Sequence, residues 1–235
     1  MPASTVKRAY FDGFRDGLPF IVLVSPFAML FGVVAAEAGL SVLQILSFSA
    51  AVFAGAAQFT ALQLMVDQAP TIVVLASALA VNLRLVMYSA TLTPHLGKAP
   101  FWQRVCIAYF VVDQSFLVAI AGYEREPGMC LRAKVAFFFG AVSPVVPFWF
   151  AMSVVGALIG TTIPDTWPLD FALPIAFIAM IAPMIRSAAH VSAAMVGVVA
   201  ALLLAGLPYN LGLLLAGLCG MMAGARVELW MERRP

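Results

Sequence analysis

Long apolar stretches joined by short connections constrain this chain more than any single motif. About 20 apolar residues are needed to cross the hydrocarbon core of a bilayer, and eight segments approach or exceed that length. They lie at about 18–37, 43–65, 70–93, 105–122, 133–159, 170–187, 190–206 and 208–225. The connections leave no room for a soluble domain, so we predict an all-α, polytopic membrane protein with residues 18–225 as a single integral membrane domain.

Composition agrees with this fold class and excludes several functions. The 235 residues are 63% hydrophobic and 10% charged, whereas soluble domains run at roughly 45–50% and about 25%. The net charge of +2 is spread between apolar blocks, which argues against nucleic acid as a partner. The three cysteines and two histidines show no ligand spacing, and the motifs GxxxxGK(S/T), GxSxG and HExxH are absent. We therefore expect no metal, no cofactor and no enzymatic activity.

The placement of lysine and arginine predicts the orientation, because positively charged loops stay cytoplasmic. With eight crossings both termini are cytoplasmic, residues 226–235 form a cytoplasmic tail, and ten basic residues fall inside. Lys98 and Arg104 then fall outside. If the second segment were a re-entrant loop, seven crossings would result and the basic residues from Arg125 to Lys134 would move outside. We therefore favour the even number.

The N-terminal segment, residues 1–17, carries charges of both signs. Val6, Tyr10 and Phe14 stand at helical spacing within it, which predicts a short helix on the inner membrane face. A frayed charged tail is the alternative. The apolar run that follows is longer than a signal-peptide core and lacks a cleavage site, so we interpret it as an uncleaved first span.

Arg84 is a charged residue inside the third apolar segment. A charge near the middle of a span costs a few kcal/mol, so such side chains face the bundle interior and pair with a partner. At 100° per residue, Arg84, Tyr88 and Thr91 share one helical face, while Asn82 and Ser89 share a nearly opposite face. Such a helix must be surrounded by protein, or be unwound near Asn82. Arg84 then either binds a substrate carboxylate or forms a buried ion pair with an acid.

Asp113 and Glu37 are the acids at or within membrane depth, and Asp113 is the deeper. A carboxyl group that is desolvated by the membrane and approached by an arginine suits a proton-coupled carrier. A permanently paired structural acid is the alternative. Glu37, at the end of the first span, fits an interfacial surface position.

Small residues and prolines mark places where the spans pack closely or break. In the second segment, Ala51 and Gly55 are four residues apart and Gln58 falls on the same side, where its amide needs a partner. GxxxG patterns occur at residues 156–160 and 220–224. Prolines interrupt the first, fifth and sixth segments at Pro26, Pro144, Pro147, Pro174 and Pro183. Broken helices near the midplane are typical of transporter sites, although each proline alone is explained by an ordinary kink.

Together these residues resemble a known family. The runs FRDGLPFIVLVSPFAMLFGVVAAEAGLS, VFAGAAQFTALQL and NLRLVMYSATLTPHL, all within residues 14–96, resemble the AzlC family of bacterial branched-chain amino acid exporters in order and spacing. Weaker matches extend through Asp113 and LDFALPIAFIAMI. Two positions depart from the family pattern. Leu85 stands where a histidine is common and Gln114 where a glutamate is common, and both changes remove a titratable group. If either position usually carries protons in the family, coupling here rests on Asp113 alone or the substrate range differs.

The resemblance implies a function and a site. It implies a secondary active transporter, or permease, of the bacterial inner membrane that exports branched-chain amino acids with proton coupling and works with a small AzlD-type membrane subunit. Arg84, Asn82, Gln58, Gly55 and Tyr88 are the expected substrate-binding residues, and Asp113 the expected proton-coupling residue. A homo-oligomer is compatible with the sequence. The alternative is a structural membrane subunit or a passive pore for another small solute, with Arg84 and Asp113 paired to hold the bundle together.

Overall fold

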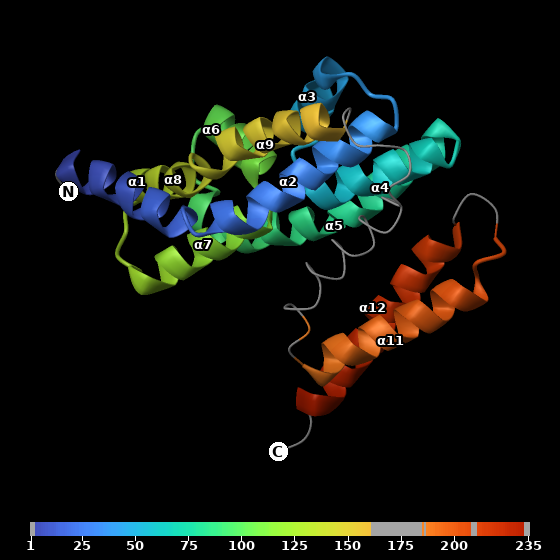
Figure 1. The fold of residues 1–235 in the computed structure, drawn as a ribbon. Coiled ribbons are helices and arrows are strands. Elements are labelled where there is room, and N and C mark those ends of the chain that lie inside the picture. Colours follow the sequence, from blue (N-terminus) through green and yellow to red (C-terminus); the bar gives the residue numbers. More distant parts are fainter. Residues whose placement is uncertain (1–2, 161–184, 186, 208–210, 233–235) are drawn as a thin grey trace.

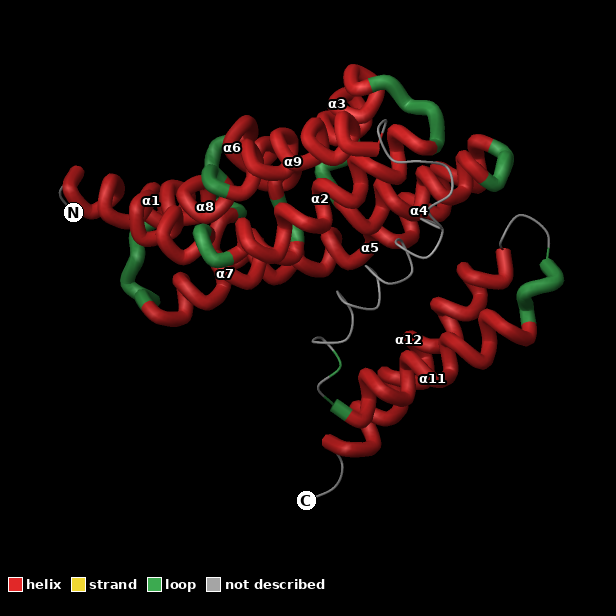
Figure 2. Tube along the Cα trace, viewed as in Figure 1, coloured by secondary structure: helices red, strands yellow, loops and turns green. Residues whose placement is uncertain are grey.

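The computed structural model describes residues 3–160, 185, 187–207 and 211–232, and these residues form helices without strands. The predicted all-α class is confirmed (Figures 1 and 2). The helices are α1 (Ala3–Gly17), α2 (Phe20–Glu37), α3 (Val42–Ala51), α4 (Gly55–Val66), α5 (Thr71–Leu96), α6 (Phe101–Phe110), α7 (Asp113–Arg125), α8 (Leu131–Val142), α9 (Val145–Gly160), α11 (Ala188–Leu203) and α12 (Leu211–Glu232).

Among the described residues, three helical stretches are long and apolar enough to cross a membrane. They are α2, α5, and the stretch Leu131–Gly160, which joins α8 and α9. Pro144 lies at the junction of α8 and α9, whereas Pro26 lies inside α2 without interrupting it. Pro147 lies in the first turn of α9, where a missing backbone N–H is tolerated. Pro174 and Pro183 fall outside the described residues.

The second apolar segment does not continue through the bundle but folds back on itself as the hairpin α3–α4. Next to the turn, Ser49 of α3 accepts a hydrogen bond from the amide of Gln58 in α4 (Nε2 to Oγ, 3.2 Å). Farther from the turn, Ile45 and Leu62 share a buried cluster. The two arms are therefore antiparallel. At 1.5 Å per residue they are about 15 and 18 Å long, against about 39 Å for the 26-residue α5.

The fourth apolar segment forms a second hairpin, α6–α7, of similar size. Helix α6 runs antiparallel to α5, because it begins soon after α5 ends and because Asp113, just beyond its own end, contacts Arg84 and Tyr88 of α5. Helix α7 runs parallel to α5, because Asp113 contacts Tyr88 at one end and Tyr123 contacts His95 at the other. Both ends of this hairpin therefore lie at the end of the bundle where α5 ends and α8 begins.

The hydropathy pattern did not predict the hairpin form of the second and fourth apolar segments. A hydropathy pattern cannot distinguish one crossing of about 20 residues from two apolar arms of 10–14 residues, a length typical of re-entrant segments. Ala51 and Gly55 flank the break at Val52–Ala54. They therefore do not share a helical face, and the single small-residue surface expected from their spacing was wrong, although side chains of α2 and α9 do approach Gly55 closely.

The frame around the hairpins consists of two parallel helix pairs, α1 with α8 and α2 with α9. Gly13 of α1 lies against the carbonyl group of Phe137 in α8, and Gly140 of α8 lies against the carbonyl group of Tyr10 in α1. Neither position has room for a Cβ. Residues 3–17, expected as a helix at the membrane face or as a frayed tail, are thus helical and packed along α8.

The second pair repeats this contact. Gly32 of α2 lies against the carbonyl group of Ser153 in α9, and Gly156 of α9 lies against that of Met29 in α2. Gly156 begins the GxxxG pattern at residues 156–160, and in the other pattern Gly220 lies against the carbonyl group of Ala193, which brings α12 close to α11. Small residues allow this close approach of helix backbones in membranes.

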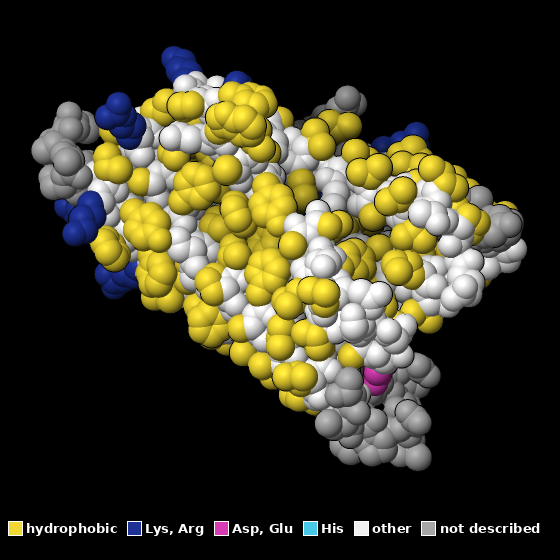
Figure 3. Space-filling model, turned by 90° about the horizontal axis from the view of Figure 1, so that it is seen from above, with side chains coloured by type: hydrophobic (Ala, Val, Ile, Leu, Met, Phe, Trp, Pro, Cys, Tyr) yellow, Lys and Arg dark blue, Asp and Glu magenta, His cyan; other side chains and the backbone are white. Residues whose placement is uncertain are grey.

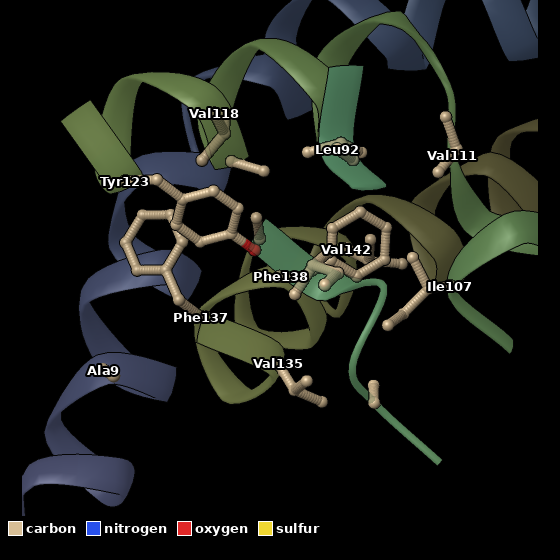
Figure 4. Close-up of a cluster of buried hydrophobic side chains, with 14 of the residues drawn as sticks. Ala9, Leu92, Ile107, Val111, Val118, Tyr123, Val135, Phe137, Phe138 and Val142 are labelled. Atoms are coloured by element: carbon tan, nitrogen blue, oxygen red, sulfur yellow. The ribbon is translucent and has the colours of Figure 1, made fainter. Parts of the chain in front are cut away.

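Each hairpin packs in its own hydrophobic cluster. The first cluster lies around α3–α4 and contains Phe31, Ile45, Phe59 and Leu62. The second lies around α6–α7 and draws on α1, α5 and α8. Figure 4 shows it, with Tyr123 of α7 beside Phe137 of α8 and with Val111 beside Ile107.

The charges separate between the two ends of the bundle. Lys98 and Arg104 lie at the end where α7 ends and α8 begins, since Gly97 and Arg104 line one pocket and His95 contacts Lys134 (3.0 Å). Lysine and arginine side chains gather at the end where α1 begins (Figure 3). Glu37 and Asp67 end α2 and α4 at the opposite end. The expectation that Lys98 and Arg104 lie apart from Arg125 and Lys134 was therefore wrong, because α6–α7 returns to the side from which it started.

Candidate functional site

The tips of the two hairpins meet beside α9. Phe53, in the break between α3 and α4, stacks on Tyr109 (ring centroids 6.1 Å apart) and meets Phe110 edge-on (5.7 Å). Trp149 of α9 packs against the same Phe53 ring (6.3 Å). Aromatic contacts of this kind fix the two breaks relative to each other and to the frame.

Breaks inside a membrane expose backbone groups that need partners. The hydroxyl group of Tyr109 donates to the carbonyl oxygen of Ala50 at the end of α3 (2.5 Å). Ser115 serves both sides of the second break, because its Oγ accepts from the N–H of Val112 (2.9 Å) and lies 2.8 Å from the carbonyl oxygen of Phe110. Side chains of the hairpins thus replace part of the helical hydrogen bonding that the breaks remove.

Arg84, Tyr88 and Asp113 come together at the second break. Asp113 is the first residue of α7, and one of its carboxylate oxygens lies 3.2 Å from Nη1 of Arg84. The other oxygen accepts a hydrogen bond from the hydroxyl group of Tyr88 (2.8 Å). Tyr88 stacks almost flat on Phe116, one turn farther along α7 (4.3 Å, 10°). The predicted common face of Arg84 and Tyr88 is confirmed, whereas Thr91 is exposed and bonds the carbonyl of Met87 in its own helix.

The ion pair leaves binding capacity unused. Arg84 approaches Asp113 through a single nitrogen, and its Nε atom is buried without a hydrogen-bond partner in the described part of the chain. The side chains of Arg84 and Asp113 are 31% and 29% exposed. A guanidinium can bind a carboxylate through two parallel N–H groups, so Arg84 retains donors for a second anion. The N-terminus of α7 adds a partial positive charge that stabilises the Asp113 carboxylate.

Helix α5 is continuous from Thr71 to Leu96, so the unwinding considered near Asn82 was wrong. The chain breaks instead at the two hairpin tips. Asn82 is half-buried and its Oδ1 atom has no partner among the described residues. It does not join Arg84 and Tyr88, because two residues along a helix place it on another face.

Gly55 and Gln58 lie in the first turns of α4, at the other tip. Gln58 is fully buried and donates to Ser49, while its Oε1 atom lacks a partner among the residues described. Nε1 of Trp149 also donates to Ser49 Oγ (3.4 Å). Gly55 lies under the rings of Phe27 and Trp149, which leave no room for a Cβ. Of the predicted set, then, Arg84, Tyr88 and Asp113 are in contact, and Gly55 with Gln58 forms a neighbouring cluster.

Sequence reasoning missed Ser49, Ser115 and Trp149. For Ser115 the sequence carried only the start of its helix, because an acid such as Asp113 in the first turn is typical of a helix N-terminus. The β-branched pair Val111-Val112 before Asp113 favours an extended connection. Ser49 and Trp149 had no comparable signal, since they are 100 residues apart in sequence. No group of three or more potential metal ligands is found among the described residues.

Comparison with known proteins agrees with the membrane fold. A family model described as AzlC protein matches residues 19–163. The Inner membrane protein YgaZ of Escherichia coli strain K12 is 25% identical, over 95% of this chain and 93% of its own length. An uncharacterized membrane protein of Helicobacter pylori is 25% identical (83% of each chain), and one of Archaeoglobus fulgidus 27% (78% of this chain, 81% of its own). No solved structure matches significantly. This chain, with more than half of its length matched by the family model, belongs to the AzlC family.

Proposed function

We propose that the chain is a secondary active transporter that exports branched-chain or similar hydrophobic amino acids across the bacterial inner membrane, coupled to protons. Family membership and membrane-protein relatives support a membrane transport role. The proposed substrate and the proton coupling rest on one observation, the contact of Arg84, Tyr88 and Asp113 close to the place where the two short hairpins meet. Helix ends at a break inside the membrane are typical of substrate sites in transporters.

The two charges of an amino acid match the two charges of this site. Arg84 binds the substrate carboxylate, and Asp113 binds the ammonium group. The zwitterion thereby separates the ion pair and replaces each of its halves, so the substrate-bound state contains no isolated charge in the membrane, where one would be costly. Tyr88 then keeps Asp113 in place through its hydroxyl group. The side-chain carbonyl oxygens of Asn82 and Gln58 are buried, have no partner among the described residues and can accept further N–H groups.

Proton coupling follows from competition at Asp113. The carboxylate holds either the ammonium group or a proton, but not both, because each neutralises the same negative charge. Export with an ammonium group on Asp113, followed by return with a proton on it, exchanges substrate for protons. Leu85 and Gln114 flank the two charged residues without titrating, so the exchange depends on Asp113 alone.

Valine efflux from membrane vesicles tests the assignment. With an imposed pH gradient, Arg84→Lys, Arg84→Gln and Asp113→Asn should each lose most of the gradient-driven efflux. Arg84→Lys is included because an ammonium group keeps the charge but not the two-pronged geometry. Normal efflux in all three variants would refute the assignment.

The partner is part of the proposal. A small AzlD-type membrane subunit is expected to co-purify with the chain in mild detergent and to raise efflux when both are expressed. Equal efflux with and without the small subunit would show that the chain is active alone.

The ion pair also favours a second candidate, a structural membrane subunit or passive pore in which Arg84 and Asp113 only hold the bundle together. Exchanging the two residues, Arg84→Asp with Asp113→Arg, separates the candidates. Restored folding with lost efflux supports the transporter site, whereas restored folding with normal efflux supports the structural pair.

A further inference from the structure

A second site lies along hairpin α6–α7. An open pocket of about 190 Å³ separates α5 from α6. Its walls include Leu92 and Leu96 of α5 and Ile107, Ala108 and Val111 of the hairpin, with Arg104 as the charged residue. The volume is below the roughly 300–1,000 Å³ of pockets for drug-sized ligands. It therefore suits a molecule of about the size of a single amino acid.

The pocket leads from one end of the bundle toward the Arg84–Asp113 pair. Arg104 and Gly97 lie at its basic end, since α6 begins just after α5 ends. Val111 lies at its other end, directly before the break that precedes Asp113. Ser89, another lining residue, follows Tyr88 in α5 but lies on a different face of that helix, so the approach to the pair is along the hairpin side, at Val111.

The lining of the pocket is complementary to an aliphatic amino acid. Arg104 is exposed and forms no ion pair or hydrogen bond with the described residues, so its guanidinium is available to a carboxylate. The apolar walls accept an aliphatic side chain, which gains about 25 cal/mol for each Å² removed from water. The hydroxyl group of Thr93 is already bonded to the carbonyl of Ser89 (2.8 Å) and leaves the wall largely apolar.

The side of the membrane follows from the charges. Positively charged ends stay cytoplasmic, and the pocket reaches the basic end of the bundle, because Gly97 and Arg104 line it and His95, two residues before Gly97, contacts Lys134. An exporter collects its substrate from the cytoplasm.

We propose that this pocket is the cytoplasmic loading site, in which Arg104 binds the carboxylate of an aliphatic amino acid before the substrate reaches Arg84 and Asp113. This inference rests on the proposed export function. Arg104 acts by raising affinity on the cytoplasmic side and takes no part in proton exchange.

Inverted membrane vesicles, whose cytoplasmic face is outside, test the kinetic consequence. Arg104→Gln should raise the KM for valine uptake roughly tenfold, as expected for the loss of a charged hydrogen bond, with Vmax close to that of the unmodified chain. Lys98→Gln is the matched control, because it removes a charge at the same end from a residue that does not line the pocket, and it should change KM less than twofold. Ala108→Trp, which fills the pocket, should raise KM as Arg104→Gln does.

The outcomes separate the two proposals. An unchanged KM in both Arg104→Gln and Ala108→Trp would overturn the loading site while leaving the export function intact. Absence of valine transport by the unmodified chain would instead refute the export function.

Labelling of a cysteine gives a readout that needs no transport. In a chain whose native cysteines are serine, which removes the exposed Cys106 of the same helix, Ala108→Cys should react with a membrane-impermeant maleimide in inverted vesicles. Valine should slow the reaction, and isobutylamine, which lacks the carboxylate, should not. Adding Arg104→Gln should abolish the protection. Reaction of the introduced cysteine only in right-side-out vesicles would overturn the proposal. A block of that reaction that is relieved by extracting anionic lipid and is not affected by valine would overturn it as well.

Discussion

Hairpins α3–α4 and α6–α7 are alike in length and in the meeting of their tips, but they differ in what the tips carry. At the α3–α4 tip the polar groups are uncharged and fully buried, with Ser49 accepting from Gln58 and Trp149. At the α6–α7 tip the buried Ser115 is joined by a charged group, Asp113, which is partly exposed and paired with Arg84. The comparison teaches that similar backbone breaks can position either a buried neutral network or a titratable group.

The largest expected effect is on efflux and comes from removing the charge at the α6–α7 tip. Asp113→Asn should lower gradient-driven valine efflux by about 100-fold or more, because the amide can neither bind a proton nor neutralise an ammonium group. Gln58→Leu should lower it by about tenfold at most, the cost of one neutral hydrogen bond. Initial efflux rates in vesicles with equal amounts of protein measure both. A larger loss in Gln58→Leu than in Asp113→Asn would reverse the roles of the tips.

For stability we expect a smaller effect with the opposite order, in which a substitution at the α3–α4 tip costs more than one at the α6–α7 tip. Ser49→Ala leaves two buried donors, Gln58 Nε2 and Trp149 Nε1, without an acceptor, at about 1–3 kcal/mol for each. Ser115→Ala removes one cap at the second break and should cost about 1 kcal/mol. Thermal unfolding in detergent should therefore show the greater loss for Ser49→Ala. Equal losses would mean that the network at the first tip adds nothing beyond a single bond.

The smallest expected effect concerns the contact between the tips. Tyr109→Phe keeps the ring that packs on Phe53 and removes the hydroxyl group that donates to Ala50. It should lower the unfolding free energy by about 1 kcal/mol and leave the KM for valine unchanged. Tyr109→Ala, which also removes the ring, is the comparison variant. A change of KM in Tyr109→Phe would show that this hydroxyl group contacts substrate.

The sequence predicted the helical membrane class and the common face of Arg84 and Tyr88, because apolar length and helical spacing are local properties. It left open whether Arg84 pairs with Asp113, and it did not predict the contact of Tyr88 with Asp113. The direction of the chain after each break is not local. Segments 43–65 and 105–122 have the hydropathy of crossings, and their return depends on contacts such as Ser49 with Gln58. The charge argument failed at Lys98 and Arg104 for the same reason, since it assumed that α6 and α7 form one straight span.

The contacts of the frame have a consequence for how the chain is built. Gly13 contacts Phe137, three residues before Gly140, and Gly140 contacts Tyr10, three residues before Gly13. Gly32 and Gly156 show the same relation. Such reciprocity is the mark of an isologous interface, in which one surface patch contacts a copy of itself across a two-fold axis. A single polypeptide thus contains the kind of interface found in symmetric dimers, with its axis parallel to the paired helices. A bulky residue at either glycine of a pair would disturb the same contact from opposite sides.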